Sequence, residues 1–196
     1  MMKKSIPVIA IGWLVSCSAP ENKQEPLPAP TPDLSFTSVQ IADDANLWWG
    51  RALADLNGDG ILDVALIDNS GRGGWLGYLK GDTLGNKWEK VVVAETSPNG
   101  ALFGTGDLEV GDMDDDGDID LIGVEHPGEW ADADASATLF WYENEQGSWT
   151  PHNIGTIPSA LKDLSVKDLD GDNLPEVITA TFNAETLSVF HKGEGD

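Results

Sequence analysis

Short apolar runs separated by turn-forming residues fill the chain from about residue 34 onward. The runs are rich in Val, Ile, Leu and aromatic residues, and Gly, Asn and Asp stand between them. Apolar runs of this length, bounded by such residues, are typical of β-strands joined by tight turns. The pattern therefore predicts an all-β fold.

The pattern is organised as three repeats, each built around an acidic loop. The loops span residues 55–63, 112–120 and 168–176, and their first residues are 57 and 56 positions apart. Two apolar runs follow each loop, and residues 88–94 (WEKVVVA) match residues 149–154 (WTPHNI) as a further run. A short alternating segment also precedes each loop, at residues 52–54, 108–111 and 164–167. Four short strands per period of 50–60 residues describe one blade of a β-propeller, although the third repeat lacks its last strand. We therefore expect propeller-type blades of four antiparallel strands in about three repeats, as in a partial or truncated propeller.

The number of predicted blades does not decide whether the propeller closes into a ring. Three repeats are fewer than the roughly four to eight blades of closed propellers. A truncated propeller, an open array of three blades, and a ring completed by a second copy of the chain all fit. Residues 36–42 (FTSVQIA) have the character of the strand that the third repeat lacks, so they are expected to complete that blade.

The acidic loops carry the oxygen ligands of a hard cation. Side-chain oxygens stand at positions 1, 3, 5 and 9, with Gly or Asn at position 6. Calcium binds several oxygens at about 2.3–2.6 Å around a tight turn, whereas magnesium demands octahedral geometry and retains water. An EF-hand needs an acid at position 12, where this chain has Leu66, Gly123 and Thr179. A charged surface, or turns that use Asp and Asn for local bonds, is the alternative. The predicted ligands of up to three Ca²⁺ ions, with a backbone carbonyl at position 7, are Asp55, Asn57, Asp59, Ile61, Asp63, Asp112, Asp114, Asp116, Asp118, Asp120, Asp168, Asp170, Asp172, Leu174 and Glu176.

These loops resemble those of a known family. DLNGDGILDV, DMDDDGDIDL and DLDGDNLPEV resemble the calcium loops of FG-GAP/VCBS repeats, as in integrin α-subunit propellers, and Phe103-Gly104 beside Gly106 resembles the motif that names the family. The resemblance covers most of residues 36–196 and implies a calcium-binding propeller repeat. The third loop departs from the pattern at Asn173, where Gly is usual, although Asn still tolerates the left-handed conformation. Its Pro175 and the longer Glu176 predict a weaker site.

The first residues have the order of an export signal. A basic start, an apolar run at 6–15 and the sequence Leu-Val-Ser-Cys, which ends at Cys17, resemble the lipobox of bacterial lipoproteins. We expect a signal peptide at 1–16, a lipidated Cys17 with a Pro-rich linker at 17–33, and the repeat domain at 34–196. An ordinary signal peptide with an incidental cysteine is the alternative. The expected location is the bacterial outer membrane or cell surface.

The charge of the chain restricts its partners. A net charge of −23 argues against nucleic acid as a partner. We therefore expect a protein or glycan ligand, and contact with membranes through the lipid anchor alone. Self-association is expected if a second copy of the chain completes the ring.

An insertion in the second repeat is the candidate ligand surface. The distance from loop to tyrosine is 30 residues there (Asp112 to Tyr142) and 23 in the first repeat (Asp55 to Tyr78). Insertions in connecting segments often carry binding residues. Residues expected in such segments, outside the repeated core positions, are Trp48, Trp49, His126, Glu129 and Trp130.

No sequence motif of a catalytic nucleophile, phosphate loop or zinc centre is present. The leading hypothesis is therefore a surface module that binds calcium and a partner without catalysis. The alternative is an accessory part of a carbohydrate-active enzyme, such as a polysaccharide lyase or a sugar dehydratase. Trp88 and Trp149 recur at one place in the repeat, which indicates core positions.

The expected lipid anchor can be tested directly. Wild-type protein produced in a bacterial host should partition into the detergent phase, and Cys17→Ser should move it to the aqueous phase, because the acylated thiol is lost. Phase separation followed by immunoblotting measures both. A Cys17→Ser protein that remains equally membrane-bound would refute lipidation.

Overall fold

The chain divides into two units, Met1–Ser38 and Val39–Asp196. The computed structural model describes residues 35–43, 48–68, 74–100, 102–103, 108–126 and 134–193. Residues 35–38, the described part of the first unit, contain no strand. The expected signal peptide, Cys17 and Pro-rich linker lie outside the described residues. Within the described part of the chain, no helix is long and apolar enough to cross a membrane.

The first repeat folds into a four-stranded antiparallel sheet, blade 1. Its strands are β1 (Trp48–Ala54), β2 (Asp63–Asp68), β3 (Trp75–Lys80) and β4 (Glu89–Ala94). They pair in chain order, and residues 55–63, which we call loop 1, join β1 to β2. Trp48 and Trp49 therefore belong to β1, and the prediction that they lie in a connecting segment is wrong.

The second repeat folds into blade 2, whose innermost strand is in two pieces. Its strands are β5 (Leu102–Phe103), β6 (Glu109–Gly111), β7 (Asp120–His126), β8 (Ala137–Glu145) and β9 (Ser148–Ile157). Both short strands pair with β7, β5 at its end and β6 at its start. Loop 2, residues 112–120, therefore joins β6 to β7 in the way that loop 1 joins β1 to β2.

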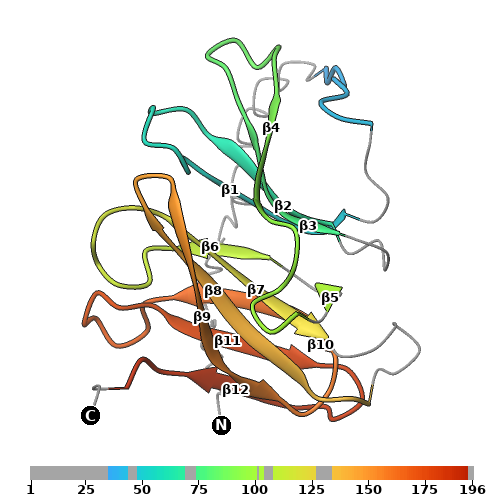
Figure 1. The fold of residues 1–196 in the computed structure, drawn as a ribbon, viewed down its shortest axis with the longest axis vertical. Coiled ribbons are helices and arrows are strands. Elements are labelled where there is room, and N and C mark those ends of the chain that lie inside the picture. Colours follow the sequence, from blue (N-terminus) through green and yellow to red (C-terminus); the bar gives the residue numbers. More distant parts are fainter. Residues whose placement is uncertain are drawn as a thin grey trace, which may run out of the picture. The chain divides into compact units, whose positions relative to one another are not determined.

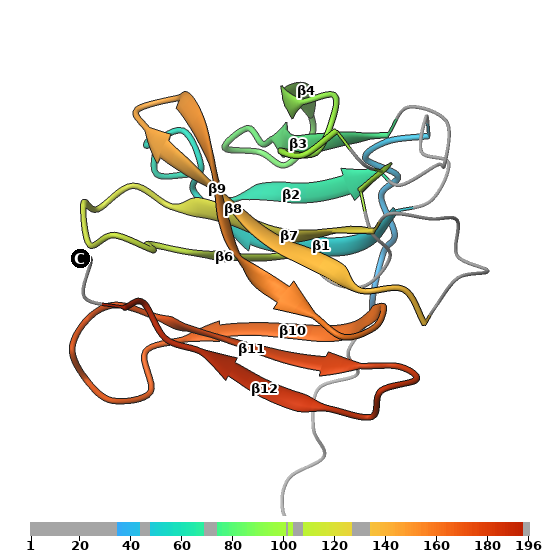
Figure 2. The ribbon, with the colours of Figure 1, turned by 60° about the horizontal axis from the view of Figure 1, so that its bottom comes forward.

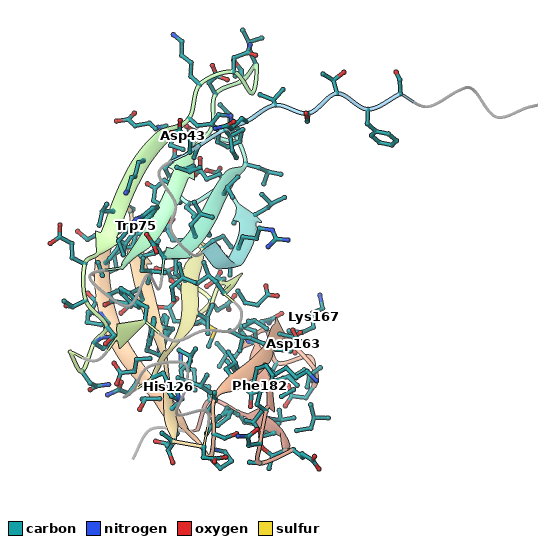
Figure 3. The ribbon with its side chains drawn as sticks, turned by 90° about the vertical axis from the view of Figure 1, so that its right-hand side faces the viewer. Asp43, Trp75, His126, Asp163, Lys167 and Phe182 are labelled. Carbon is teal, nitrogen blue, oxygen red and sulfur yellow. The ribbon has the colours of Figure 1, made fainter. Side chains whose placement is uncertain are left out.

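The third repeat forms blade 3, a sheet of three described strands. They are β10 (Leu161–Lys167), β11 (Glu176–Thr181) and β12 (Leu187–Phe190), and loop 3, residues 168–176, joins the first two. The expectation that residues 36–42 complete this blade is wrong. Ile41 and Ala42 instead pack against a buried cluster of blade 1 that contains Leu66, Trp75 and Leu79, because this contact partly buries their apolar side chains. Figure 3 shows Trp75 on this sheet.

The three blades form an open stack in chain order, with blade 2 in the middle (Figures 1 and 2). Strand β6 contacts both β1 and β10, so the first strands of successive blades lie side by side. Successive side chains of a strand point to opposite faces. The buried face between blades 1 and 2 is formed by Ala54, Leu56, Ala65, Ile67, Leu76, Tyr78, Phe103, Leu108, Leu121, Phe140 and Tyr142.

A second core joins blades 2 and 3, and it uses the other face of β7. Leu121 faces blade 1, whereas Ile122 and Val124 pack with Leu164 and Val177 of blade 3. Blade 2 is thus buried on both faces, which agrees with the uninterrupted burial of β7. The architecture is all-β with propeller-like blades, as the sequence predicts.

Candidate metal centres in the three loops

The first residue of each loop holds the turn together. Both oxygens of Asp55 accept backbone N–H groups from across loop 1, from Asp59 at 3.1 Å and from Gly60 at 2.7 Å. These bonds favour the carboxylate, and the one from Gly60 contributes most to lowering the pKa of Asp55. Asp112 accepts the equivalent bonds from Asp116 and Gly117. In loop 3, Asp168 accepts the bond from the sixth residue, Asn173, and a second one from the fourth residue, Gly171, in place of the fifth.

Two positions in every loop have the left-handed backbone conformation. They are position 4, with φ of 73°, 62° and 87° at Gly58, Asp115 and Gly171, and position 6, with φ of 81°, 96° and 74° at Gly60, Gly117 and Asn173. Gly adopts this conformation without strain, and Asp and Asn are the side chains that tolerate it best. The departures at Asp115 and Asn173 therefore leave the loop geometry unchanged.

The ninth residue of each loop is a buried carboxylate that closes the loop. Asp63 and Asp120 are fully buried and Glu176 is 3% exposed. In each case one oxygen accepts the N–H of the loop's second residue, which is Leu56, Met113 or Leu169, at distances of 3.1, 2.7 and 2.8 Å. The other oxygen of the two aspartates accepts an N–H from the far end of the next hairpin, Gly81 in blade 1 and Asn144 in blade 2. This acid therefore fixes the loop to its blade.

The fifth and seventh positions are also linked. The position-5 carboxylates accept the N–H of the position-7 residue in all three loops, Ile61 to Asp59 at 3.0 Å, Asp118 to Asp116 at 2.8 Å and Leu174 to Asp172 at 2.8 Å. The structure thus places the residues predicted to offer a backbone carbonyl next to the carboxylates. Coordination by those carbonyls stays a prediction.

Three carboxylates converge in loop 2. Ligand atoms of Asp112, Asp114 and Asp120 all lie within 4.8 Å of one another. Burial, followed by a hydrogen bond with Glu143, raises the pKa of Asp114. Burial also raises the pKa of Asp120 to about 7, against the lowering effect of the two backbone N–H groups that it accepts. Among the described residues, Asp114 Oδ1 is one of the few buried polar atoms without a hydrogen-bond partner. A divalent cation there would stabilise the charges and use the free oxygen.

Three carboxylates also lie close together in loop 3. Ligand atoms of Asp168, Asp170 and Asp172 lie within 4.8 Å of one another, and all three residues are more exposed than the buried Glu176. The structure therefore brings together predicted ligands at positions 1, 3 and 5 of this loop.

A lysine from β3 of the same blade already lies against loop 1. The ammonium of Lys80, at the end of β3, lies 3.2 Å from Asp59 Oδ2 and 3.4 Å from Asn57 Oδ1. The hydrogen bond to Asp59 is the main cause that raises the pKa of Lys80. The amide of Asn57 in turn donates to Asp63 Oδ2 at 2.8 Å. An ion that enters loop 1 must therefore displace Lys80 from two of the predicted ligands.

Asn144 links loop 1 to loop 2, a role that the sequence analysis did not predict. Its side-chain NH₂ donates to the carbonyls of Leu56 in loop 1 and Ile119 in loop 2, at 3.2 and 3.1 Å. A cleft of about 520 Å³ lies between these loops and is lined by Asn144. Because Asn144 and Leu56 are 88 residues apart, no local pattern could have paired them.

The residues predicted as a ligand surface are only partly described. His126 is not an exposed loop residue, because it is the last residue of β7 and is 6% exposed (Figure 3). The neighbouring Glu125 is also buried and accepts two hydrogen bonds from Asn99. Glu129 and Trp130 lie outside the described residues. Trp88 and Trp149 pack against buried clusters, as the repeat predicts.

Residues 112–179 match the family model of an FG-GAP-like repeat. This segment begins at loop 2 and ends in β11, so it covers most of blade 2 and the start of blade 3, including loop 3. The chain therefore carries an FG-GAP-like repeat, and the resemblance seen in the loops is confirmed over these residues. A comparison with curated proteins finds no match.

The pKa of Asp120 predicts a pH dependence that calcium should abolish. Its value of about 7 in the folded protein exceeds the roughly 3.9 of an unfolded aspartate, so the stability that protonated Asp120 contributes is complete below about pH 4 and is lost as the pH rises to about 7. In chelator, the melting temperature should fall over this range, and Asp120→Asn should flatten the curve. In calcium, the ionised form is stabilised and the fall should disappear. Equal slopes for wild type and Asp120→Asn in chelator would contradict this assignment.

The position of Lys80 predicts that its removal strengthens calcium binding at loop 1. Lys80→Met keeps the length of the side chain and removes the ammonium that contacts Asp59. Isothermal titration with Ca²⁺ should show tighter binding of one ion than in wild type. Lys90→Met is the matched control, because it removes one charge from the same blade at a residue that lies over Trp75 and not in a loop. Equal effects of the two substitutions would show that only the net charge matters.

Proposed function

We propose that this chain is a calcium-stabilised β-propeller-type module, exported and anchored through a lipid on Cys17, that binds a protein or glycan partner. The observation that carries the calcium assignment is the convergence of Asp112, Asp114 and Asp120 in loop 2, with a buried oxygen of Asp114 left without a hydrogen bond among the described residues. Carboxylates this close together, one of them fully buried, cannot all ionise without a large cost in free energy unless a cation is present.

The chemistry of the donors favours calcium among divalent ions at loop 2. All three converging ligands are carboxylates on a loop, and hard cations take oxygen ligands. Calcium accepts irregular sets of six to eight oxygens, whereas magnesium needs a near-ideal octahedron. Glu143 lies close enough to Asp114 to form a hydrogen bond and is a further acidic group beside the loop. Loop 2 is therefore the strongest of the three proposed sites, and loop 1, where Lys80 of β3 contacts two of the predicted ligands, is the weakest.

The partner would bind to surfaces that the blades leave exposed. Leu62 in loop 1 and Leu169 in loop 3 are 59% and 53% exposed, on loops that the carboxylates hold rigid. At the outer edge of blade 3, Leu187 and Val189 of β12 are 76% and 44% exposed. An exposed strand edge can pair with another strand. This edge supports completion of the blade by a strand from a partner or from a second copy of the chain.

Each bound calcium ion should raise the melting temperature of the domain by an amount that can be assigned to one loop. A site with a dissociation constant near ~10⁻⁴ M in ~1 mM calcium adds roughly 1.4 kcal/mol, or about 3 to 6 °C in melting temperature for a domain of this size. Asp116→Ala should remove about one such step from the difference between the calcium and chelator melting temperatures. Taking the difference cancels the loss of the turn bond that Asp116 accepts from Asp118.

The matched control for this substitution is the neighbouring Asp115. It has φ of 62°, and the other loops have Gly at this position, so Asp115→Gly removes one charge without straining the backbone. The calcium-dependent step should survive in this variant. A melting temperature indifferent to chelator, or equal losses in the two variants, would show that the loops are turns without a metal.

A further inference from the structure

At one structurally equivalent position, each blade places a different type of side chain beside its own acidic loop. Strand pairing aligns Leu79 with Val64, Tyr142 with Leu121 and Phe190 with Val177, and each of these second partners directly follows the ninth loop residue. The next residues along the chain are therefore structurally equivalent, and they are Lys80, Glu143 and His191. Each one reaches its own loop: Lys80 contacts Asp59, Glu143 lies beside Asp114, and His191 contacts Glu176.

In blade 3 this position brings an imidazole to two carboxylates. One ligand atom each from Asp170, Glu176 and His191 lies within 4.8 Å of the other two. His191 Nδ1 is 3.3 Å from Glu176 Oε1, while Glu176 Oε2 accepts the N–H of Leu169 at 2.8 Å. In blade 2, by contrast, both oxygens of the shorter Asp120 accept backbone N–H groups. The longer side chain of Glu176 thus turns one carboxylate oxygen toward the histidine.

An imidazole ligand changes which metal ion such a site prefers. Calcium and magnesium favour oxygen ligands, whereas imidazole nitrogen suits zinc and its neighbours among the transition metals. Zinc sites with three protein ligands from histidine and carboxylates keep a further position open for water or another ligand. His191 also lines a cleft of about 210 Å³ beside Trp141 and Phe190, which leaves room next to the cluster.

We propose that Asp170, Glu176 and His191 form a binding site for a divalent transition-metal ion of the zinc class. The site rests on the proposed function and deepens it at loop 3, because Asp170 and Glu176 are also predicted calcium ligands. The two ions therefore compete at this loop, whereas loop 2, with its carboxylates alone, keeps its preference for calcium. The three blades thus differ in cation chemistry at one equivalent position.

Zinc titration of the metal-free full chain tests the proposal. Zn²⁺ is added in competition with a chromophoric chelator, and Co²⁺ absorption reports nitrogen coordination. Wild type should bind one ion that His191→Ala binds at least about tenfold more weakly, the lower end of the loss caused by removing even a partner of a metal ligand. Because the side chain of His191 is 64% exposed, the variant should keep the wild-type melting temperature in calcium. Equal zinc affinity of the two proteins would overturn the proposal.

Two further variants separate this site from adventitious binding and from the calcium proposal. His152→Ala removes another accessible imidazole, which stacks on Trp141 in blade 2, and it should leave zinc affinity unchanged. An equal loss in this variant would overturn the assignment to His191. Asp116→Ala should reduce the effect of calcium and leave zinc binding intact. Zinc binding that depends on His191 in a protein indifferent to calcium would refute the proposed function alone, and the reverse result would refute the zinc site alone.

Discussion

The buried carboxylate at the ninth position of each loop is the interaction on which the rest of the structure depends. It accepts the N–H of the second loop residue, so it closes the turn that positions the other acids. In blades 1 and 2 it also accepts an N–H from the end of the following hairpin, which fixes the loop to its own sheet. The loop and the blade therefore form one unit, and a change in the charge of this acid affects both.

This arrangement concentrates negative charge where water is excluded. The pKa of Asp120 rises to about 7 mainly because the side chain is buried, although two backbone N–H groups favour its charged form. Hydrogen bonds alone therefore do not compensate for burial, and a positive charge near the loop would stabilise the ionised form. Loop 1 obtains one from Lys80, whereas in loop 2 the equivalent residue is Glu143, another acid. The charge next to the loop thus differs from blade to blade.

Packing between the sheets joins the three described blades into one stack. Blade 2 buries both faces of β7, with Leu121 toward blade 1 and Ile122 toward blade 3. Blade 1 covers part of its outer face with Ile41 and Ala42. Along β12 of blade 3, Leu187 and Val189 are exposed among the described residues.

The sequence by itself determined the elements of the fold and the ligand pattern of the loops, since both depend on local periodicity. Strand order within blades, the three loops and the tolerance of Asn173 for positive φ follow from residues close in the chain. The tertiary structure alone decided which side chains from other strands meet the loops. The sequence aligned Tyr78 with Tyr142, but strand register aligns Leu79 with Tyr142, a shift of one residue that moves a side chain to the opposite face. Only that register brings Lys80, Glu143 and His191 to one equivalent position, because it is set by pairing between strands and not by spacing along the chain.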